Sequence, residues 1–451
     1  MSSQKSSLKQ NPGDSVFKKV NLLNLGCSKN QVDSEALLGE FKTAGYGIVS
    51  EQEDSDVIVI NTCGFIESAK EESINEILAA VQNKGAHQKV VVAGCLSQRY
   101  LEDLKLEIPE VDFMVGTYKP GQILQGLNIA TPETDLCESG TFKNRVLLGD
   151  DKHHAYVKIA EGCNRTCSFC AIPSMRGKQR SRTIADIIDE VNALTEQGVQ
   201  EISLIGQDLS FYGREKGGPG ETLEMLLNGL VNHTDVPWIR LMYAYPAFLN
   251  NGLLDLMAKE DRICNYLDMP IQHASDKMLK LMRRGHTQAS LRTLLTKLRQ
   301  KVPNIALRTT LLLGFPGETK DDFEQLMELI QDVKFDRLGC FTFSEEEGTH
   351  SFDLKEKRVP LEVAEKRAKD LMDVQRLISM ERNESLIGTT QRVLIDSVAE
   401  GSEYHFYART QWDAPEVDNR VQILEGNADV GTFREVKIVA ASEYDLDAIL
   451  L

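Results

Sequence analysis

Short apolar runs separated by amphipathic stretches organise the first part of the chain. The runs cover residues 20–25, 56–60 and 89–93. They lack polar alternation, which is typical of strands buried on both faces of a parallel sheet. Apolar residues at helical spacing predict helices over 34–44 and 68–81. We therefore expect an open parallel α/β domain over residues 18–135.

The alternation of predicted strands and helices continues after a polar stretch, which we interpret as a linker over 136–154. Further apolar runs follow at residues 155–160, 201–205, 239–243, 266–268, 306–313 and 338–343. Six strand-and-helix units are too few for a closed eightfold barrel but suit an open, partial (β/α)6 barrel. A long charged helix over 363–386 is expected to close this domain, which we place at 155–384.

The end of the chain, residues 385–451, has a different pattern. Pieces rich in β-formers alternate with turn residues, at 391–395, 404–408, 421–423 and 432–439. This pattern predicts a small antiparallel β-barrel of about five strands. The expected fold class is therefore α/β plus β. Residues 1–17 are polar, and we expect them to be a disordered lead-in.

Composition agrees with about three globular domains in 451 residues. Hydrophobic residues make up 41% of the chain and charged residues 26%, which is ordinary for a soluble protein. No apolar run reaches membrane-spanning length, and the polar start lacks the apolar region of a secretory signal. We therefore expect a cytoplasmic protein with no membrane partner.

Nine cysteines in a long chain without an export signal indicate metal or catalytic use more than a disulfide framework. Three of them, Cys163, Cys167 and Cys170, have the spacing C-x3-C-x2-C directly after the first strand of the second domain. Three thiolates suit an iron–sulfur cluster. Because no fourth cysteine lies nearby, one iron would be open to bind a ligand. A zinc knuckle or a redox cysteine cluster is the alternative.

This segment, with Phe169 before the last cysteine, resembles the signature of the radical S-adenosylmethionine (SAM) superfamily. The resemblance implies a 4Fe–4S cluster whose open iron binds SAM and cleaves it to a 5′-deoxyadenosyl radical. Two strand-end loops fit this interpretation, because residues 311–319 resemble the SAM-contacting motif of that superfamily and residues 204–208 end a strand with polar groups at the barrel mouth. The candidate SAM contacts are Phe169, Gly206, Gln207, Asp208, Gly314 and Gly317. Ordinary strand-to-helix turns are the alternative for both loops.

A second trio, Cys27, Cys63 and Cys95, is dispersed in the sequence, yet each cysteine follows a predicted strand. The carboxyl ends of parallel strands meet at one edge of a sheet, so these thiols can converge on one site. We predict a second cluster site there, again one ligand short. The alternative is three buried structural cysteines. The remaining cysteines are expected to be structural or incidental, namely Cys137 in the linker, Cys264 in a loop and Cys340 in a strand.

Two cysteine trios followed by a small TRAM-like barrel resemble the methylthiotransferases over essentially the whole chain. The resemblance implies two 4Fe–4S clusters, with the auxiliary one carrying the sulfur that is transferred. It implies that one SAM donates the methyl group and another yields the radical. It also implies an electron donor and a sulfur donor as partners.

Two branches of that family compete, one modifying tRNA adenosine near the anticodon and one modifying an aspartate of small-subunit ribosomal protein uS12. Four segments look like the protein-modifying branch, at 25–35, 170–177, 266–273 and 409–418. Residues 385–451 contain five Lys and Arg against twelve Asp and Glu. That balance suits a basic ribosomal protein better than RNA, and a merely solvated acidic surface is the alternative.

We therefore expect methylthiolation of the β-carbon of an aspartate in uS12, either free or in the small subunit, with direct RNA binding not favoured. The alternatives are a tRNA adenosine methylthiotransferase and, more remotely, a non-enzymatic metal-binding module of ribosome assembly. The histidines at two positions are weaker evidence for function than the cysteines. His153 and His154 are expected to be a solvated pair, and His273 either lines the pocket or is a hydrogen-bonded structural residue.

Overall fold

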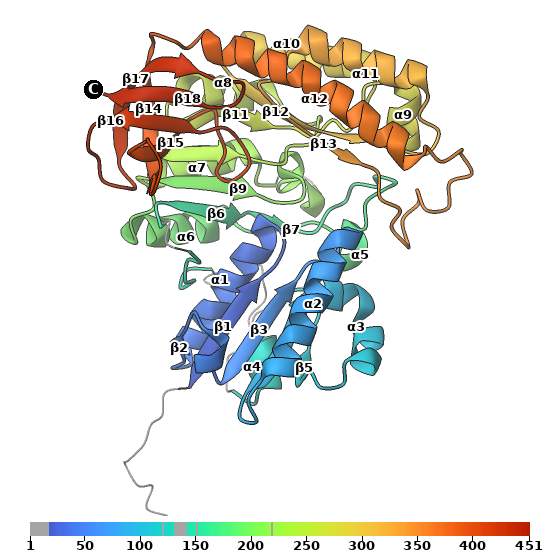
Figure 1. The fold of residues 1–451 in the computed structure, drawn as a ribbon, viewed down its shortest axis with the longest axis vertical. Coiled ribbons are helices and arrows are strands. Elements are labelled where there is room, and N and C mark those ends of the chain that lie inside the picture. Colours follow the sequence, from blue (N-terminus) through green and yellow to red (C-terminus); the bar gives the residue numbers. More distant parts are fainter. Residues whose placement is uncertain (1–17, 120, 130–141, 150–151, 218–219) are drawn as a thin grey trace, which may run out of the picture.

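Three parts make up the chain in the computed structural model, which describes residues 18–119, 121–129, 142–149, 152–217 and 220–451 (Figure 1). An N-terminal α/β domain lies below a central domain, and a C-terminal β-barrel packs against the central domain. The predicted lead-in and Cys137 lie outside the described residues. None of the described helices is both long and apolar enough to cross a membrane.

The N-terminal domain is a parallel sheet in the order β2-β1-β3-β4-β5. Its strands are β1 Lys19–Asn24, β2 Gly47–Ile48, β3 Val57–Thr62, β4 Lys89–Gly94 and β5 Phe113–Met114. Its helices are α1 Ser28–Thr43, α2 Glu67–Asn83, α3 Cys95–Glu107 and α4 Gln122–Gly126, with a 3-10 turn η1 at Gln52–Asp54. The three predicted strands are confirmed. The two edge strands, β2 and β5, are too short to leave a pattern in the sequence.

The central domain is an open sheet of six parallel strands in the order β13-β12-β11-β10-β9-β6. These strands are β6 His154–Lys158, β9 Glu201–Ile205, β10 Trp238–Leu241, β11 Ile263–Asp268, β12 Ala306–Leu313 and β13 Arg337–Thr342. A small hairpin of β7 Ala160–Glu161 and β8 Arg180–Ser181 lies beside β6. The partial (β/α)6 barrel is therefore confirmed.

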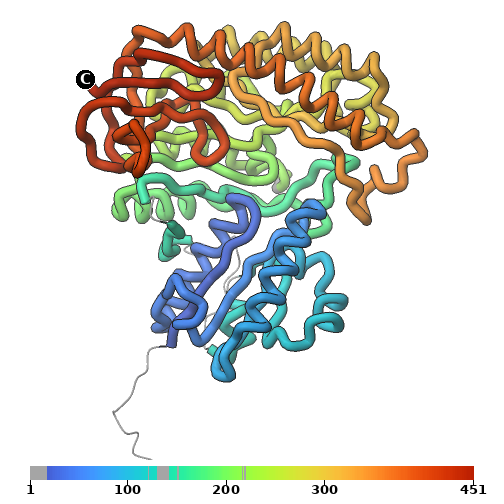
Figure 2. Tube along the Cα trace, viewed as in Figure 1, coloured from blue at the N-terminus to red at the C-terminus, as the bar shows by residue number. Residues whose placement is uncertain are grey.

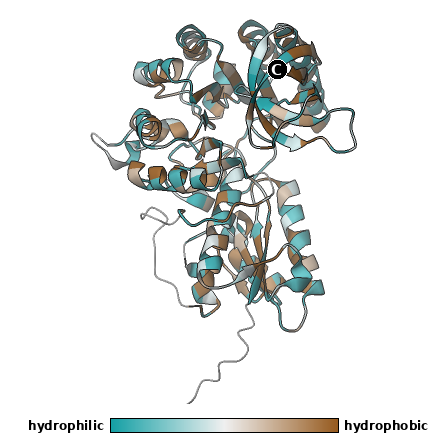
Figure 3. Cartoon of the chain, turned by 90° about the vertical axis from the view of Figure 1, so that its left-hand side faces the viewer, coloured by the Kyte–Doolittle hydropathy of each residue, from teal (hydrophilic) through white to brown (hydrophobic). Residues whose placement is uncertain are grey.

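Helices cover the outer side of this sheet, because their apolar faces pack against the strands and their polar faces meet solvent. They are α6 Ile184–Glu196, α7 Leu223–His233, α8 Asn251–Lys259, α9 Asp276–Leu281, α10 Gln288–Lys301, α11 Lys320–Val333 and α12 Leu361–Glu384, with 3-10 turns η2 Leu209–Phe211 and η3 Arg214–Lys216. The short helix α5 Ile172–Arg176 lies instead against α3 of the N-terminal domain. Figure 3 shows hydrophobic segments along the strands and hydrophilic outer faces on the helices. The long closing helix is confirmed as α12.

The C-terminal domain is a closed barrel in the order β14-β15-β16-β18-β17. Its strands are β14 Thr390–Val398, β15 Phe406–Thr410, β16 Val421–Glu425, β17 Phe433–Ala441 and β18 Leu446–Leu450. One part of the prediction is corrected, because β16 and β18 pair in parallel while the other pairs are antiparallel. A closed ring of five strands cannot alternate direction at every pair, so one parallel pair is required.

The barrel is fastened to the central domain by buried charges. Figure 2 shows the two parts side by side. Arg409 donates to Glu201 in β9 with an N–O distance of 2.8 Å, and Arg337 donates to Asp413 at 2.8 Å. The Tyr266 hydroxyl donates to Asp418 at 2.7 Å. Segment 409–418 is therefore a domain interface, and part of the acidic charge of the barrel is neutralised inside the protein.

Two expectations for single residues are wrong. His153 and His154 are not a solvated pair. His153 is buried with its Nε2 3.0 Å from an oxygen of Asp396, and His154 lies in β6, where burial lowers its pKa to about 3. Cys264 lies in β11 and is fully buried, so it is not in a loop. His154 and Cys264 were misplaced because β6 and β11 begin earlier than their apolar runs indicate, whereas His153 is buried by its contact with Asp396 of the barrel.

Candidate functional site

One cavity of about 380 Å³ lies between the N-terminal and central domains, and six cysteines line it. Three of them come from the strand-end loops of the N-terminal domain and three from the loop after β7, namely Cys27, Cys63, Cys95, Cys163, Cys167 and Cys170. The structure thus brings each trio together and also brings the two trios to one space.

Glycines with left-handed backbone conformations allow the N-terminal trio to converge. Gly26 has φ +97°, and a Cβ there would lie 2.9 Å from the Cβ of Cys63. Gly94 has φ +106°, and a Cβ there would lie 2.4 Å from the carbonyl oxygen of Thr62. A side chain at either position would be strained and would push the cysteine loops apart.

A buried amide, Asn30, links these loops to one another. Its Nδ2 donates to the carbonyl oxygens of Leu25 at 2.9 Å and Thr62 at 3.0 Å. Its Oδ1 accepts from Arg176 Nη2 at 2.6 Å and lies 3.8 Å from the thiol of Cys95. Arg176 belongs to the central domain, so this amide also ties the two domains together.

The central trio lies on a loop whose sulfurs receive hydrogen bonds. The backbone N–H of Arg165 donates to the sulfur of Cys163 at 3.3 Å, and Arg284 Nη1 donates to the sulfur of Cys167 at 3.1 Å. The N–H of Cys170 donates to the carbonyl of Cys167 at 3.2 Å. Such donors stabilise sulfur that carries negative charge.

The thiols differ in how readily they ionise. Burial raises the pKa of Cys95 and Cys163 to about 11 and that of Cys170 to about 12. Cys27 is different. Loss of solvent around its thiol acts to raise the pKa, but the charges of Lys29 and Arg176 outweigh this and lower it. Metal ligation requires thiolates, so the raised values mean that loading the sites releases protons.

The donor set fits the clusters. Nearby carboxylates are already paired, since Asp33 and Glu161 each bind Lys158 and Arg176. Sulfur is therefore the free ligand type on both sides of the cavity. Among the described residues, no three Cys, His, Asp or Glu side chains close around a single ion. Two open trios of thiols suit 4Fe–4S clusters that each keep one iron free.

The candidate SAM contacts divide into two groups. Phe169, Gly206 and Gln207 line the cavity. Asp208 lies behind its wall, where it accepts from Arg165 Nε at 2.6 Å. Gly314 and Gly317 are also outside the lining, and the N–H of Gly314 donates to Glu318 at 2.7 Å. Direct SAM contact by these residues stays a prediction.

The cationic side chains and the tyrosines of the cavity were not predicted from the sequence. They are Lys29, Arg165, Arg176, Tyr243, Tyr245 and Arg284. A signal was present, because Lys29 and Arg165 each stand two residues after a cysteine of one trio. The tyrosines carried no such signal. Tyr243 has φ +64°, a rare conformation for this residue type that is typical of functional sites.

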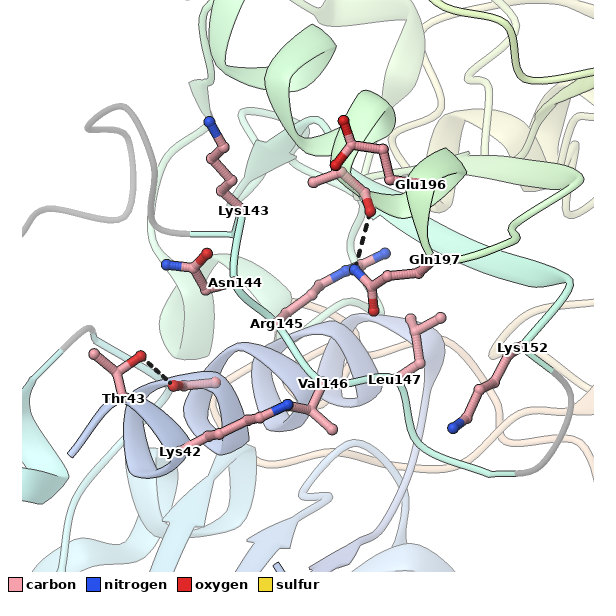
Figure 4. A pocket seen from close by; sticks show the side chains of 12 residues that line it. Lys42, Thr43, Lys143, Asn144, Arg145, Val146, Leu147, Lys152, Glu196 and Gln197 are labelled. Atoms are coloured by element: carbon pink, nitrogen blue, oxygen red, sulfur yellow. Dashed lines mark hydrogen bonds between the residues drawn. The ribbon is translucent and has the colours of Figure 1, made fainter. Parts of the chain in front are cut away.

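A second cavity, of about 820 Å³, lies between the end of α1, residues 142–147 and α6 (Figure 4). Its lining is mostly polar, with Lys42, Lys143 and Lys152 around it. None of the described residues that line it is a cysteine. The sulfur chemistry therefore belongs to the smaller cavity.

Comparison with known families matches each of the three domains. Residues 19–116 match the uncharacterized protein family UPF0004, residues 157–330 match the radical SAM superfamily, and residues 387–450 match the TRAM domain. Among solved structures, the radical SAM methyltransferase TsrM from Kitasatospora setae has a TM-score of 0.55 at 14% identity, covering 84% of this chain and 81% of that chain. The cobalamin-dependent radical enzyme OxsB has a TM-score of 0.52 at 12% identity, covering 80% and 58%. At these identities the likeness shows the fold.

The domain match identifies a radical SAM domain, the fold agrees with it, and the curated relatives show that the chain is a radical SAM enzyme. Curated relatives narrow this class. The ribosomal protein uS12 methylthiotransferase RimO of Flavobacterium psychrophilum is 44% identical over 95% of this chain and 97% of its own length. That of Myxococcus xanthus is 44% identical over 96% and 91%. The chain belongs to the RimO family of radical SAM methylthiotransferases, which use SAM and two 4Fe–4S clusters.

Proposed function

We propose that this enzyme adds a methylthio group to the β-carbon of an aspartate in ribosomal protein uS12. The observation that carries the proposal is the meeting of both cysteine trios at one cavity. A carbon placed there would face both cysteine trios, and so would be within reach of the clusters that they would hold. The relatives, which are similar along almost their entire length, are uS12 methylthiotransferases, and this supports the same substrate.

The residues that line the cavity have two roles in this reaction, which are to bind the clusters and to exclude water. We assign Cys163, Cys167 and Cys170 to the cluster that binds SAM, and Cys27, Cys63 and Cys95 to the auxiliary cluster. When bound, these groups supply the hydrogen-abstracting radical, the sulfur and the methyl group. The protein holds the substrate carbon between the trios, and apolar walls that include Phe65 and Phe169 exclude water.

The charges of the barrel support a protein substrate over RNA. Of its five basic side chains, Arg409 is buried in ion pairs with Glu201 and Asp396 and cannot contact phosphate. The acidic side chains that remain at its surface suit a basic ribosomal protein. The reaction also needs an electron donor and a sulfur donor, and we place it in the cytoplasm, where ribosomal subunits are.

The test uses the iron-reconstituted enzyme with SAM and a reductant under anaerobic conditions. One reaction receives a peptide of the uS12 loop that carries the target aspartate, and the other receives an anticodon-stem RNA. We expect mass spectrometry to find one thiomethyl group on the peptide aspartate. Product on the RNA alone would overturn the proposal. Zinc without sulfide, in place of about eight irons per chain, would favour a binding module.

A further inference from the structure

Lys29 differs from the arginines of the cavity, because no described residue forms a hydrogen bond or an ion pair with its amino group. It is the second residue of α1, it lines the cavity, and it is only 8% exposed. Its Nζ lies over the ring of Tyr243, 3.1 Å from the ring centre. Across the described residues, Lys29 has neither a hydrogen bond nor an ion pair from its amino group. A buried ammonium without a counter-ion is costly unless a ligand supplies one.

The other cations of the cavity are already engaged. Arg165 Nε pairs with Asp208 at 2.6 Å. Arg176 pairs with Asp33 at 3.0 Å and with Glu161 at 2.9 Å. Arg284 donates to the sulfur of Cys167 and to the carbonyl of Pro270. Arg165 Nη2 and Arg284 Nε each keep an unpartnered N–H group, but both guanidinium groups have other partners. Among the described residues of the lining, Lys29 is thus the cation whose charged group has no hydrogen-bond or ion-pair partner at all.

The surroundings of Lys29 favour negative charge. The first turn of α1 contains no acidic residue, so the partial positive charge of the helix N-terminus is not offset within the helix. The Tyr243 ring holds the ammonium through a cation–π contact, and the backbone of Tyr243 is fixed by its N–H bond to Asp268 at 3.3 Å. The ammonium is therefore held in place before an anion arrives.

We propose that Lys29 binds the side-chain carboxylate of the substrate aspartate and so determines specificity for that residue. This inference rests on the proposed function. In aspartate the carboxyl carbon is bonded directly to the β-carbon, so holding the carboxylate fixes the reacting carbon one bond away. Because Lys29 stands two residues after Cys27, the β-carbon is then placed beside the auxiliary trio. Asparagine has the same shape but no charge, and Lys29 would discriminate against it.

The test measures binding of two synthetic peptides to the anaerobic, iron-reconstituted enzyme. One peptide carries the target aspartate of the uS12 loop, and the other carries asparagine in its place. A charge-assisted contact predicts that the wild-type enzyme binds the aspartate peptide about 10- to 100-fold more tightly. Lys29→Met keeps the length of the side chain but removes the charge, and it should bind the two peptides equally. Lys29→Arg should keep part of the preference.

Controls separate this role from a structural one. Lys42→Met removes an exposed lysine of the same helix and should leave the preference intact. Iron content is measured for each variant. If Lys29→Met does not bind its clusters, the role of Lys29 is tested by the preference of the wild type and of Lys29→Arg for the aspartate peptide over the asparagine peptide. Equal binding of both peptides by the wild type would overturn the assignment. So would a Lys29→Met variant that keeps the preference while its affinity for SAM falls.

Failure of this inference differs from failure of the proposed function. If the wild-type enzyme modifies the peptide but Lys29→Met retains the preference for aspartate, only the role of Lys29 is wrong. If the wild-type enzyme neither binds nor modifies the peptide and instead modifies RNA, the proposed substrate is wrong, and the assignment of Lys29 is wrong with it.

Discussion

Arg176 Nη2 donates a 2.6 Å hydrogen bond to the side-chain oxygen of Asn30 across the boundary between the two cluster domains. Arg176 follows the central cysteine loop, and Asn30 follows Cys27. The same amide oxygen lies 3.8 Å from the thiol of Cys95. One contact therefore connects the segments that position the two cysteine trios. The packing of the two domains thus determines the distance between the trios.

Replacing Arg176 should weaken that interface. In Arg176→Met, the buried carboxylates of Asp33 and Glu161 lose a cation, and removing one partner of a buried pair costs about 3–5 kcal/mol. We expect a lower thermal midpoint of unfolding. Lys369→Met, which removes an exposed pair on α12, is the control and should leave the midpoint unchanged. Equal midpoints for the two variants would contradict the structural role of Arg176.

Substituting cysteines should separate the two halves of the reaction. Cys163→Ala should abolish SAM cleavage, whereas Cys95→Ala should spare cleavage and stop sulfur insertion. Each variant should retain about four irons per chain instead of about eight. Deoxyadenosine and thiomethyl product are measured side by side. Cys340→Ala, at a cysteine outside the cavity, should behave like wild type. Sulfur insertion by Cys95→Ala would refute this division of roles.

The backbone at Gly94 should be intolerant of a side chain. In Gly94→Ala the new Cβ meets the Thr62 carbonyl at 2.4 Å with φ at +106°, which costs about 1–3 kcal/mol and displaces Cys95. We expect iron to be lost from the auxiliary site while SAM cleavage persists. Gly339→Ala is the matched control, because Gly339 has no atom within 4 Å of a new Cβ. Full iron loading of Gly94→Ala would show that the loop can adapt.

Acid should release the barrel from the central domain. Burial acts to raise the pKa of Glu201, but Arg240 and Arg409 outweigh it and lower the pKa to about 2 from its ordinary value near 4.5. Glu201 therefore stabilises the interface above about pH 4.5, and this contribution is lost as the pH falls toward 2. Glu201→Gln should lack that part of the pH dependence.

Tryptophan fluorescence can follow this transition, because the chain has two tryptophans and both lie at the interface. Trp238 packs edge-on against Phe433 of the barrel, with ring centres 4.8 Å apart, and Trp412 lies beside Arg382 of α12. The acid transition of the wild type should be steeper than that of Glu201→Gln between pH 4.5 and 2. Identical transitions would mean that other groups control the interface.

Much of this protein could be predicted from local patterns. The buried strands β1, β3 and β4 form continuous apolar runs, and the central cysteines share a short loop, so their proximity is set by covalent spacing. The gathering of Cys27, Cys63 and Cys95 followed from the rule that parallel strands end at one edge. The parallel pairing of β16 with β18 and the burial of His153 could not be predicted, because both depend on closure and docking of the barrel.

The sequence by itself determined the class of chemistry, because thiol spacing, strand order and domain succession are local or topological properties of one chain. Only the tertiary structure decided that both trios face one cavity, that Arg176 and Asn30 join their supports, and that no described residue forms a hydrogen bond or ion pair with the Lys29 amino group there. The physical reason is that these facts depend on which side chains remain unpaired after the domains pack. Which ion pairs form depends on the positions of all charged groups at the interface. The periodicity of the sequence therefore does not predict them.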